Sequence, residues 1–124
     1  MSHPSYIYAT ADQIKKLGTE FFKQRNERIE REREALIQEY MIGNAKYWSW
    51  KSFRFELVTR EDAIRELSKP FTFGDKWHAA EYTGCLWANR VQDLMDSAEA
   101  VSPYATMLVD VEVFAILAKY ERFL

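Results

Sequence analysis

The sequence predicts a mainly α-helical protein of the α+β kind, with one minor β element. Residues 11–42 contain no proline and a single glycine, so they can form one long helix. Apolar residues recur at helical spacing in two later stretches, at about 76–99 and from 110 to about 123. Strand-like alternation is most evident near residues 52–58. We therefore expect a long N-terminal helix, a short strand and two further substantial helices.

Length and composition limit the class of protein. A chain of 124 residues can bury about two thirds of its surface, so we expect a single domain over residues 1–124. The content of 48% apolar and 15% aromatic residues excludes a disordered or collagen-like chain. The formal net charge of −2 argues against non-specific binding to duplex nucleic acid.

The expected location is the cytoplasm. Cys85 is the only cysteine, which fits a reducing compartment and excludes an internal disulfide. The first residues lack a basic segment followed by an apolar run, so we expect no secretory signal. No stretch approaches eighteen apolar residues, so we expect no membrane association.

Residues 1–9 precede the long helix as an extended arm. Pro4 disfavours a helix there, and Tyr6 and Tyr8 favour a strand. One hypothesis is that this arm adds a strand to a neighbouring subunit. Thr10 is a good N-cap residue for the helix that follows.

The long helix is apolar at both ends and charged between them. Residues 23–34 carry most of the charge, and Arg28 and Glu32 stand at ion-pair spacing. A helix over 11–42 would be about 48 Å long, more than a small domain spans. We therefore expect it to project and to associate with a second copy, as a homodimer or higher oligomer. The expected oligomer interface is Phe21, Phe22, Leu36, Ile37 and Tyr40.

The shorter elements follow from capping and alternation. Thr59 starts a capping box for a short helix that Ser68-Lys69-Pro70 ends, and Asp75 can cap the helix 76–99. Residues 105–109 favour a strand, and Asp110 can cap the last helix. A strand that continues through 113 is the alternative, because valines alternate there.

An aromatic and basic cluster is the main candidate binding site. Phe53, Phe55 and Leu57 alternate as the buried face of a strand, whereas Trp48 and Trp50 are out of phase with them. Tryptophan and arginine dominate binding hot spots. Bases also stack on aromatic rings while Lys and Arg contact phosphates. The predicted contact residues are Trp48, Trp50, Lys51, Arg54 and Arg60.

A metal or thiol site is the weaker candidate. His78, Glu81 and Cys85 would share one face of a helix, and all three residue types can bind zinc. A histidine and a cysteine seven residues apart lie about 10 Å apart along a helix, however, which is too far for a direct hydrogen bond. We expect no cofactor and no metal.

These observations predict a small non-catalytic, cytoplasmic binding protein. We expect an oligomeric regulator or inhibitor that recognises another macromolecule, most readily a protein, of the kind that phages and mobile elements encode. The first alternative is a binder of nucleotides, small ligands or single-stranded nucleic acid that uses the aromatic and basic cluster. The second is a metal- or thiol-dependent enzyme. The residues leave the partner, the oligomer number and the biological role open.

Overall fold

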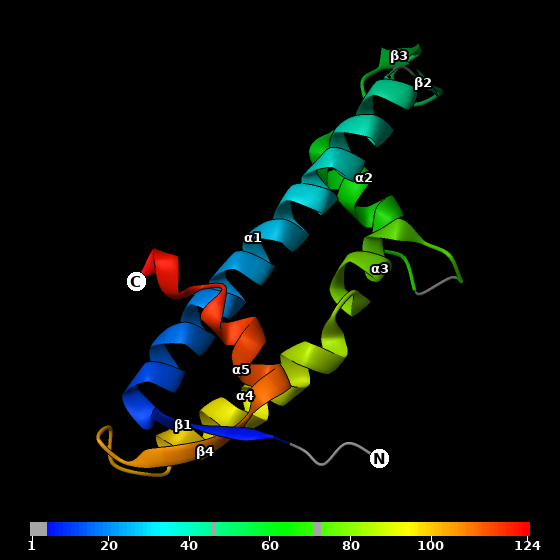
Figure 1. Ribbon diagram of the computed structural model, residues 1–124. Helices are drawn as coiled ribbons and strands as arrows, with labels where there is room; N and C mark the ends of the chain where they lie inside the picture. Colours follow the sequence, from blue (N-terminus) through cyan, green and yellow to red (C-terminus); the bar gives the residue numbers. More distant parts are fainter. Residues whose placement is uncertain (1–4, 46, 71–72) are drawn as a thin grey trace. The chain divides into compact units, whose positions relative to one another are not determined.

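The computed structural model describes residues 5–45, 47–70 and 73–124. It confirms a mainly α-helical fold with minor β structure (Figure 1). Each strand pairs with one other strand, so the described residues form two separate two-stranded sheets. The helices are α1 (Ala11–Gly43), α2 (Arg60–Leu67), α3 (Lys76–Tyr82), α4 (Cys85–Glu99), α5 (Val111–Ala118) and the 3-10 turn η1 (Glu121–Phe123). The strands are β1 (Tyr6–Thr10), β2 (Tyr47–Ser49), β3 (Arg54–Glu56) and β4 (Thr106–Asp110).

Contacts divide the chain into two compact units. The first unit joins the N-terminal residues through Asn26 to Gly84–Leu124, and the second is Glu27–Thr83. The helix α1 contributes residues to both units. The expectation of one domain with a projecting helix stays a prediction.

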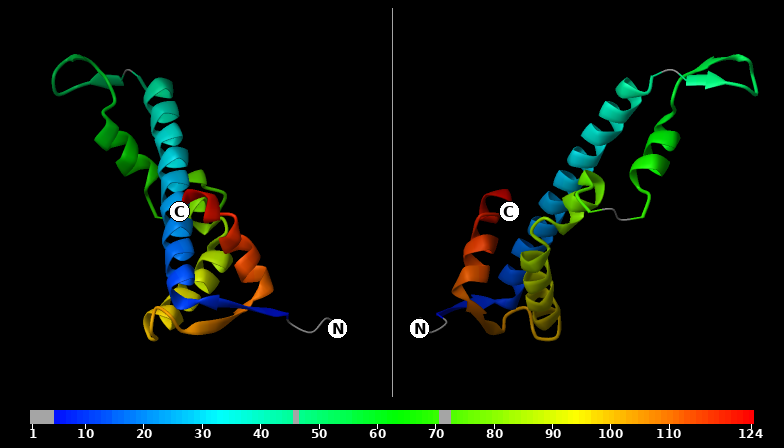
Figure 2. Two further views of the ribbon diagram at one scale, coloured as in Figure 1. Left: turned by 60° about the vertical axis from the view of Figure 1, so that its left-hand side comes forward. Right: turned by 90° about the vertical axis from the view of Figure 1, so that its right-hand side faces the viewer.

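The first unit is built on an antiparallel ribbon of β1 and β4. The register pairs Tyr6 with Asp110 and Thr10 with Thr106. Each strand leads directly into a helix, and α1, α4 and α5 lie on the same side of the ribbon in every view (Figure 2). The Asp110 carboxylate accepts a hydrogen bond from the Glu112 N–H at 2.7 Å, which confirms Asp110 as a helix cap.

Alternation along the ribbon separates a core face from a solvent face. Alanine and valine side chains of the two strands are buried beneath the helices, whereas the side chains between them are exposed. The helices complete the core with residues that are almost fully covered. The buried core of this unit is Ala9, Ala11, Ile14, Leu17, Phe21, Ala88, Val91, Ala98, Val109, Val113 and Leu117.

Gly18 of α1 leaves room for the Met95 side chain of α4. A Cβ atom at this position would lie 2.4 Å from the Met95 sulfur, inside van der Waals contact. We expect Gly18→Leu to lower the free energy of unfolding by about 1–3 kcal/mol, the usual cost of overpacking. Chemical denaturation measures the change, and Gly43→Leu is the matched control in the same helix because open space surrounds Gly43. An equal effect of both substitutions would contradict this packing, and adding Met95→Ala to Gly18→Leu should recover part of the loss.

In the second unit, arginines of α1 bind the backbone of α3. The Arg28 guanidinium donates to the carbonyl oxygens of Ala80 and Thr83 at 3.2 and 3.3 Å, at the C-terminal end of that helix. It also forms the predicted ion pair with Glu32 at 3.0 Å. Arg33 donates to the Trp77 carbonyl at 3.1 Å and stacks on its ring at 4.8 Å. A cation at a helix C-terminus is stabilised by the helix dipole, so these bonds fix α3.

Two predicted helix caps in this unit are confirmed. The Thr59 side chain accepts from the Asp62 N–H, and the Asp62 carboxylate accepts from the Thr59 N–H, which completes a capping box. Hydrogen bonds from the Thr59 side chain and backbone lower the pKa of Asp62. This stabilisation is present above the ordinary aspartate pKa and is lost as the pH falls through the lowered value. Asp75 caps α3 by accepting from the His78 N–H at 2.8 Å.

Several predicted boundaries are wrong. The helix expected over 76–99 is broken at Gly84, whose φ of 72° is left-handed, so α3 and α4 are separate helices. The strand alternative through 113 is wrong because α5 begins at Val111, and this helix ends at Ala118, short of the expected 123. Residues Tyr6–Thr10 of the arm pair with β4 of the same chain, and the hypothesis that the arm adds a strand to a neighbouring subunit stays a prediction. Residues 1–4 of the arm lie outside the described part.

Candidate functional site

The candidate site is the hairpin of β2 and β3 in the second unit. The two strands pair antiparallel, with Trp48 opposite Phe55 and Ser49 opposite Arg54. A four-residue turn, from Trp50 to Phe53, connects them. The strand β3 falls within the segment 52–58 that was predicted as a strand. The strand β2 was not predicted, because the residues around Ser49 show no alternation of apolar and polar side chains of their own.

Large apolar side chains are exposed along this hairpin. Trp50 is 77% exposed and Phe53 is 71% exposed, and Trp48 and Leu57 are also exposed. The Trp48 and Trp50 rings meet edge to face, with centroids 5.9 Å apart and an interplanar angle of 82°. The expectation that Phe53 and Leu57 form a buried strand face is therefore wrong, because both lie outside β3 and face solvent.

The backbone at Phe53 is strained. Its φ is 54°, and among the described residues it is the one that is not glycine and has a positive φ. A bulky residue in this left-handed conformation costs of order 1–3 kcal/mol relative to an ordinary one. Strained backbone of this kind clusters at ligand clamps and switch regions, which makes this turn the candidate contact site.

We expect Phe53→Gly to stabilise the hairpin by about 1 kcal/mol, since glycine adopts this conformation without steric cost. Amide hydrogen exchange of β2 and β3 reports the local opening free energy. Lys51→Gly is the matched control in the same turn, and it should stabilise nothing because Lys51 has no positive φ. Faster exchange in Phe53→Gly than in the native chain would contradict the strain argument.

The predicted basic residues do not converge on one point. Lys51 lies in the turn, and the Arg54 Nε atom pairs with a carboxylate oxygen of Glu56 at 3.9 Å. Arg60, at the start of α2, binds Glu34 of α1 through two nitrogens at 2.6 Å each. The hydrogen bond from Arg60 lowers the pKa of Glu34, and the same bond raises the pKa of Arg60. Arg60 thus joins α2 to α1. Of the predicted contact residues, the hairpin contains Trp48, Trp50, Lys51 and Arg54.

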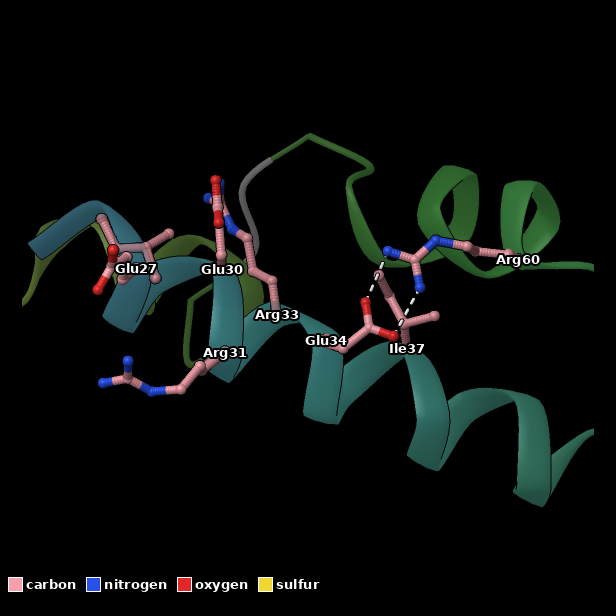
Figure 3. A pocket seen from close by; sticks show the side chains of 8 residues that line it. Glu27, Glu30, Arg31, Arg33, Glu34, Ile37 and Arg60 are labelled. Atoms are coloured by element: carbon pink, nitrogen blue, oxygen red, sulfur yellow. Dashed lines mark hydrogen bonds and ion pairs between the residues drawn. The ribbon is translucent and has the colours of Figure 1, made fainter. Parts of the chain in front are cut away.

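The hollow beside Arg60 is a charged surface of balanced sign. It has a volume of about 650 Å³, and the Arg60–Glu34 pair crosses one end of it (Figure 3). Its charged lining consists of three carboxylates and three guanidinium groups (Figure 3). Equal numbers of opposite charges give neither a phosphate site nor a cation site. The lining residues are Glu27, Ile29, Glu30, Arg31, Arg33, Glu34, Ile37 and Arg60.

The residues of the metal or thiol alternative lie on two helices. His78 and Glu81 belong to α3, whereas exposed Cys85 begins α4. The His78 Nδ1 atom lies 2.7 Å from an Asp75 carboxylate oxygen, and Glu81 pairs with Arg33 at 3.3 Å. In the described part of the chain, no group of three His, Cys, Asp or Glu side chains is placed to hold a metal ion.

The predicted oligomer interface lies against the chain's own residues. Phe21 is buried in the first unit and meets the Tyr120 ring edge to face at 5.5 Å, with Phe22 packed beside this core. In the second unit Ile37 is buried. Leu36 and Tyr40 are half-buried and line a hollow of about 540 Å³. The apolar ends of the helix therefore have partners within the chain, and oligomerisation through these residues stays a prediction.

No helix in the described part of the chain is both long and apolar enough to cross a membrane. Comparison with protein-family models, with curated protein sequences and with solved structures gave no match.

Proposed function

We propose that this chain is a non-catalytic binding protein that recognises another protein through the β2–β3 hairpin. The observation that carries this proposal is the exposure of Trp50 and Phe53 at one turn, with Phe53 held in a strained backbone conformation. Exposed aromatic side chains on a preformed loop bind partners at a low cost in conformational entropy. Tryptophan is among the residues that contribute most energy to protein interfaces.

Three features favour a protein partner over a nucleotide or single-stranded nucleic acid. The tryptophan rings meet edge to face, which leaves no pair of parallel rings to enclose a base. Arg60, the predicted phosphate contact, is bound to Glu34. With a net charge of −2, the chain also lacks the basic excess of most nucleic-acid binders. A small protein that presents such a loop acts by occupying a partner's surface, as an inhibitor or regulator does.

The test compares capture by the native chain with capture by two hairpin variants. The tagged protein is incubated with lysate of the cells that encode it, and retained proteins are quantified by mass spectrometry. We expect at least one protein to be retained by the native chain and lost with Trp50→Ala and with Phe53→Ala. Phe73→Ala is the matched control, because Phe73 is 97% exposed and lies outside the hairpin.

The other outcomes contradict the proposal. Retention that is equal for the native chain and both hairpin variants would place recognition elsewhere on the surface. Retention that disappears after nuclease treatment would support the nucleic-acid alternative. Loss of the same proteins with Phe73→Ala would show that the hairpin has no special role.

A further inference from the structure

We propose that two copies of this chain associate by pairing the outer edges of their β1 strands into a four-stranded antiparallel sheet. This surface lies in the first unit, so the inference does not depend on the hairpin or on the proposed function. The surface through which the two copies meet is then a strand edge and not the predicted helix interface. Among the described residues, this strand pairs with another strand on one side only.

The register shows which backbone groups point outward. The Val111 N–H donates to the Ser5 carbonyl and the Ala11 N–H to the Ala105 carbonyl, both at 2.9 Å. In an antiparallel pair, residues alternate between those that bond across the ladder and those that point away from it. Tyr8, midway along β1, therefore directs its N–H and C=O away from β4. In the described part of the chain no third strand joins this sheet.

The β1 edge lacks the features that usually prevent strands from pairing. Proteins block exposed edges with charges, prolines or bulges. The strand reads Tyr-Ile-Tyr-Ala-Thr, with no charge, no proline and no irregularity in its register. The β4 edge differs because it ends at Asp110, whose carboxylate pairs with Arg90 at 3.3 Å. Of the two edges, β1 is the one on which a strand can add without desolvating a charge.

A second copy fits this edge because a two-fold axis at its centre makes the pairing self-complementary. With the axis at Tyr8, the N–H and C=O of Tyr8 bond to those of Tyr8 in the second copy. Tyr6 then lies opposite Thr10, and no like charges meet. Tyr8 is 76% exposed, so its side chain gains a cross-strand neighbour on pairing.

The interface is small, so the association is weak. Short strands bury far less than the roughly 1,200 Å² of a stable complex. We expect a dissociation constant of about 10–100 µM and a monomer in dilute solution. Sedimentation velocity of the full chain, from about 5 to 500 µM, should show a monomer that converts to a dimer.

The decisive experiment exchanges charges at the two-fold position. Tyr8→Lys and Tyr8→Glu each place like charges directly opposite one another, so each variant alone should remain monomeric. Their equimolar mixture should recover the dimer, because opposite charges then face each other. Leu108→Lys and Leu108→Glu are the matched controls. Leu108 is the register partner of Tyr8 on β4 and is also exposed, and both variants should dimerise like the native chain.

A second measurement needs no variant. Amide exchange of the Tyr8 N–H, followed by NMR on the native chain, should slow by about threefold to sevenfold between 5 and 500 µM, in proportion to the fall in the monomer fraction. The inference is overturned if the native chain stays monomeric at every concentration, or if the mixture of Tyr8 variants remains monomeric. It is also overturned if Leu108→Lys abolishes the dimer or if exchange at Tyr8 does not depend on concentration.

Discussion

Leu117→Ala is expected to lower the free energy of unfolding by about 2–5 kcal/mol, the range for a buried leucine cut back to alanine. Leu117 is fully buried on α5, within the cluster that contains Leu17 and Val91. These residues come from three different helices of the first unit, so the cavity cannot close by the shift of one side chain. Urea unfolding followed by circular dichroism measures the loss.

The control is another leucine of the same unit. Leu86 is exposed on α4, so Leu86→Ala should change the free energy of unfolding by less than about 0.5 kcal/mol. A loss below 1 kcal/mol for Leu117→Ala would contradict the described core.

The same experiment tests the prediction of a single domain. Trp48, Trp50 and Trp77 lie in the second unit, whereas Trp87 lies in the first. If the chain unfolds as one cooperative unit, Leu117→Ala shifts the fluorescence transitions of all four tryptophans together. Variants that keep tryptophan only in the first or only in the second unit separate the two signals. A shift confined to Trp87 would refute the single domain.

Local signals in the sequence predicted the helices well, because capping depends on residues close together in the chain. The Thr59 capping box and the Asp75 and Asp110 caps are all present. Gly84 lies inside the helix predicted over 76–99, where a glycine costs about 1 kcal/mol relative to alanine. Its left-handed backbone ends the helix instead, because a glycine is equally suited to termination and the sequence does not separate the two roles.

The residues of the candidate site were predicted only in part, because their exposure and their partners depend on residues far away in the sequence. The phase argument singled out Trp48 and Trp50 as candidate contact residues, but it did not predict the hairpin that carries them. Arg60 was grouped with them, yet it pairs with Glu34 across 26 positions of sequence. Phe53 was assigned to the core by alternation, and the turn that exposes it has no glycine or asparagine to mark it. A contact between residues far apart in the sequence produces no local sequence pattern from which it could be predicted.

Trp50→Ala is expected to weaken binding of the captured protein by about 30-fold or more, the factor that corresponds to a hot-spot loss of 2 kcal/mol. Trp50 supplies the largest exposed ring of the turn, and its removal also deprives the Trp48 ring of its edge-to-face contact. Titration calorimetry of the purified pair measures the affinity, and hydrogen exchange verifies that the hairpin remains folded. Phe73→Ala should leave the affinity unchanged.

Phe53→Gly separates binding from folding, because the two effects are expected to have opposite signs. The substitution relieves the positive φ and should stabilise the hairpin, yet it removes an aromatic side chain from the contact surface. We expect a slower-exchanging hairpin whose affinity is at least about tenfold lower. If Phe53→Gly bound as tightly as the native chain, the strained conformation would have no role in recognition. Strain retained in an exposed turn favours a role for the side chain that it presents, since glycine at this position would fold more stably.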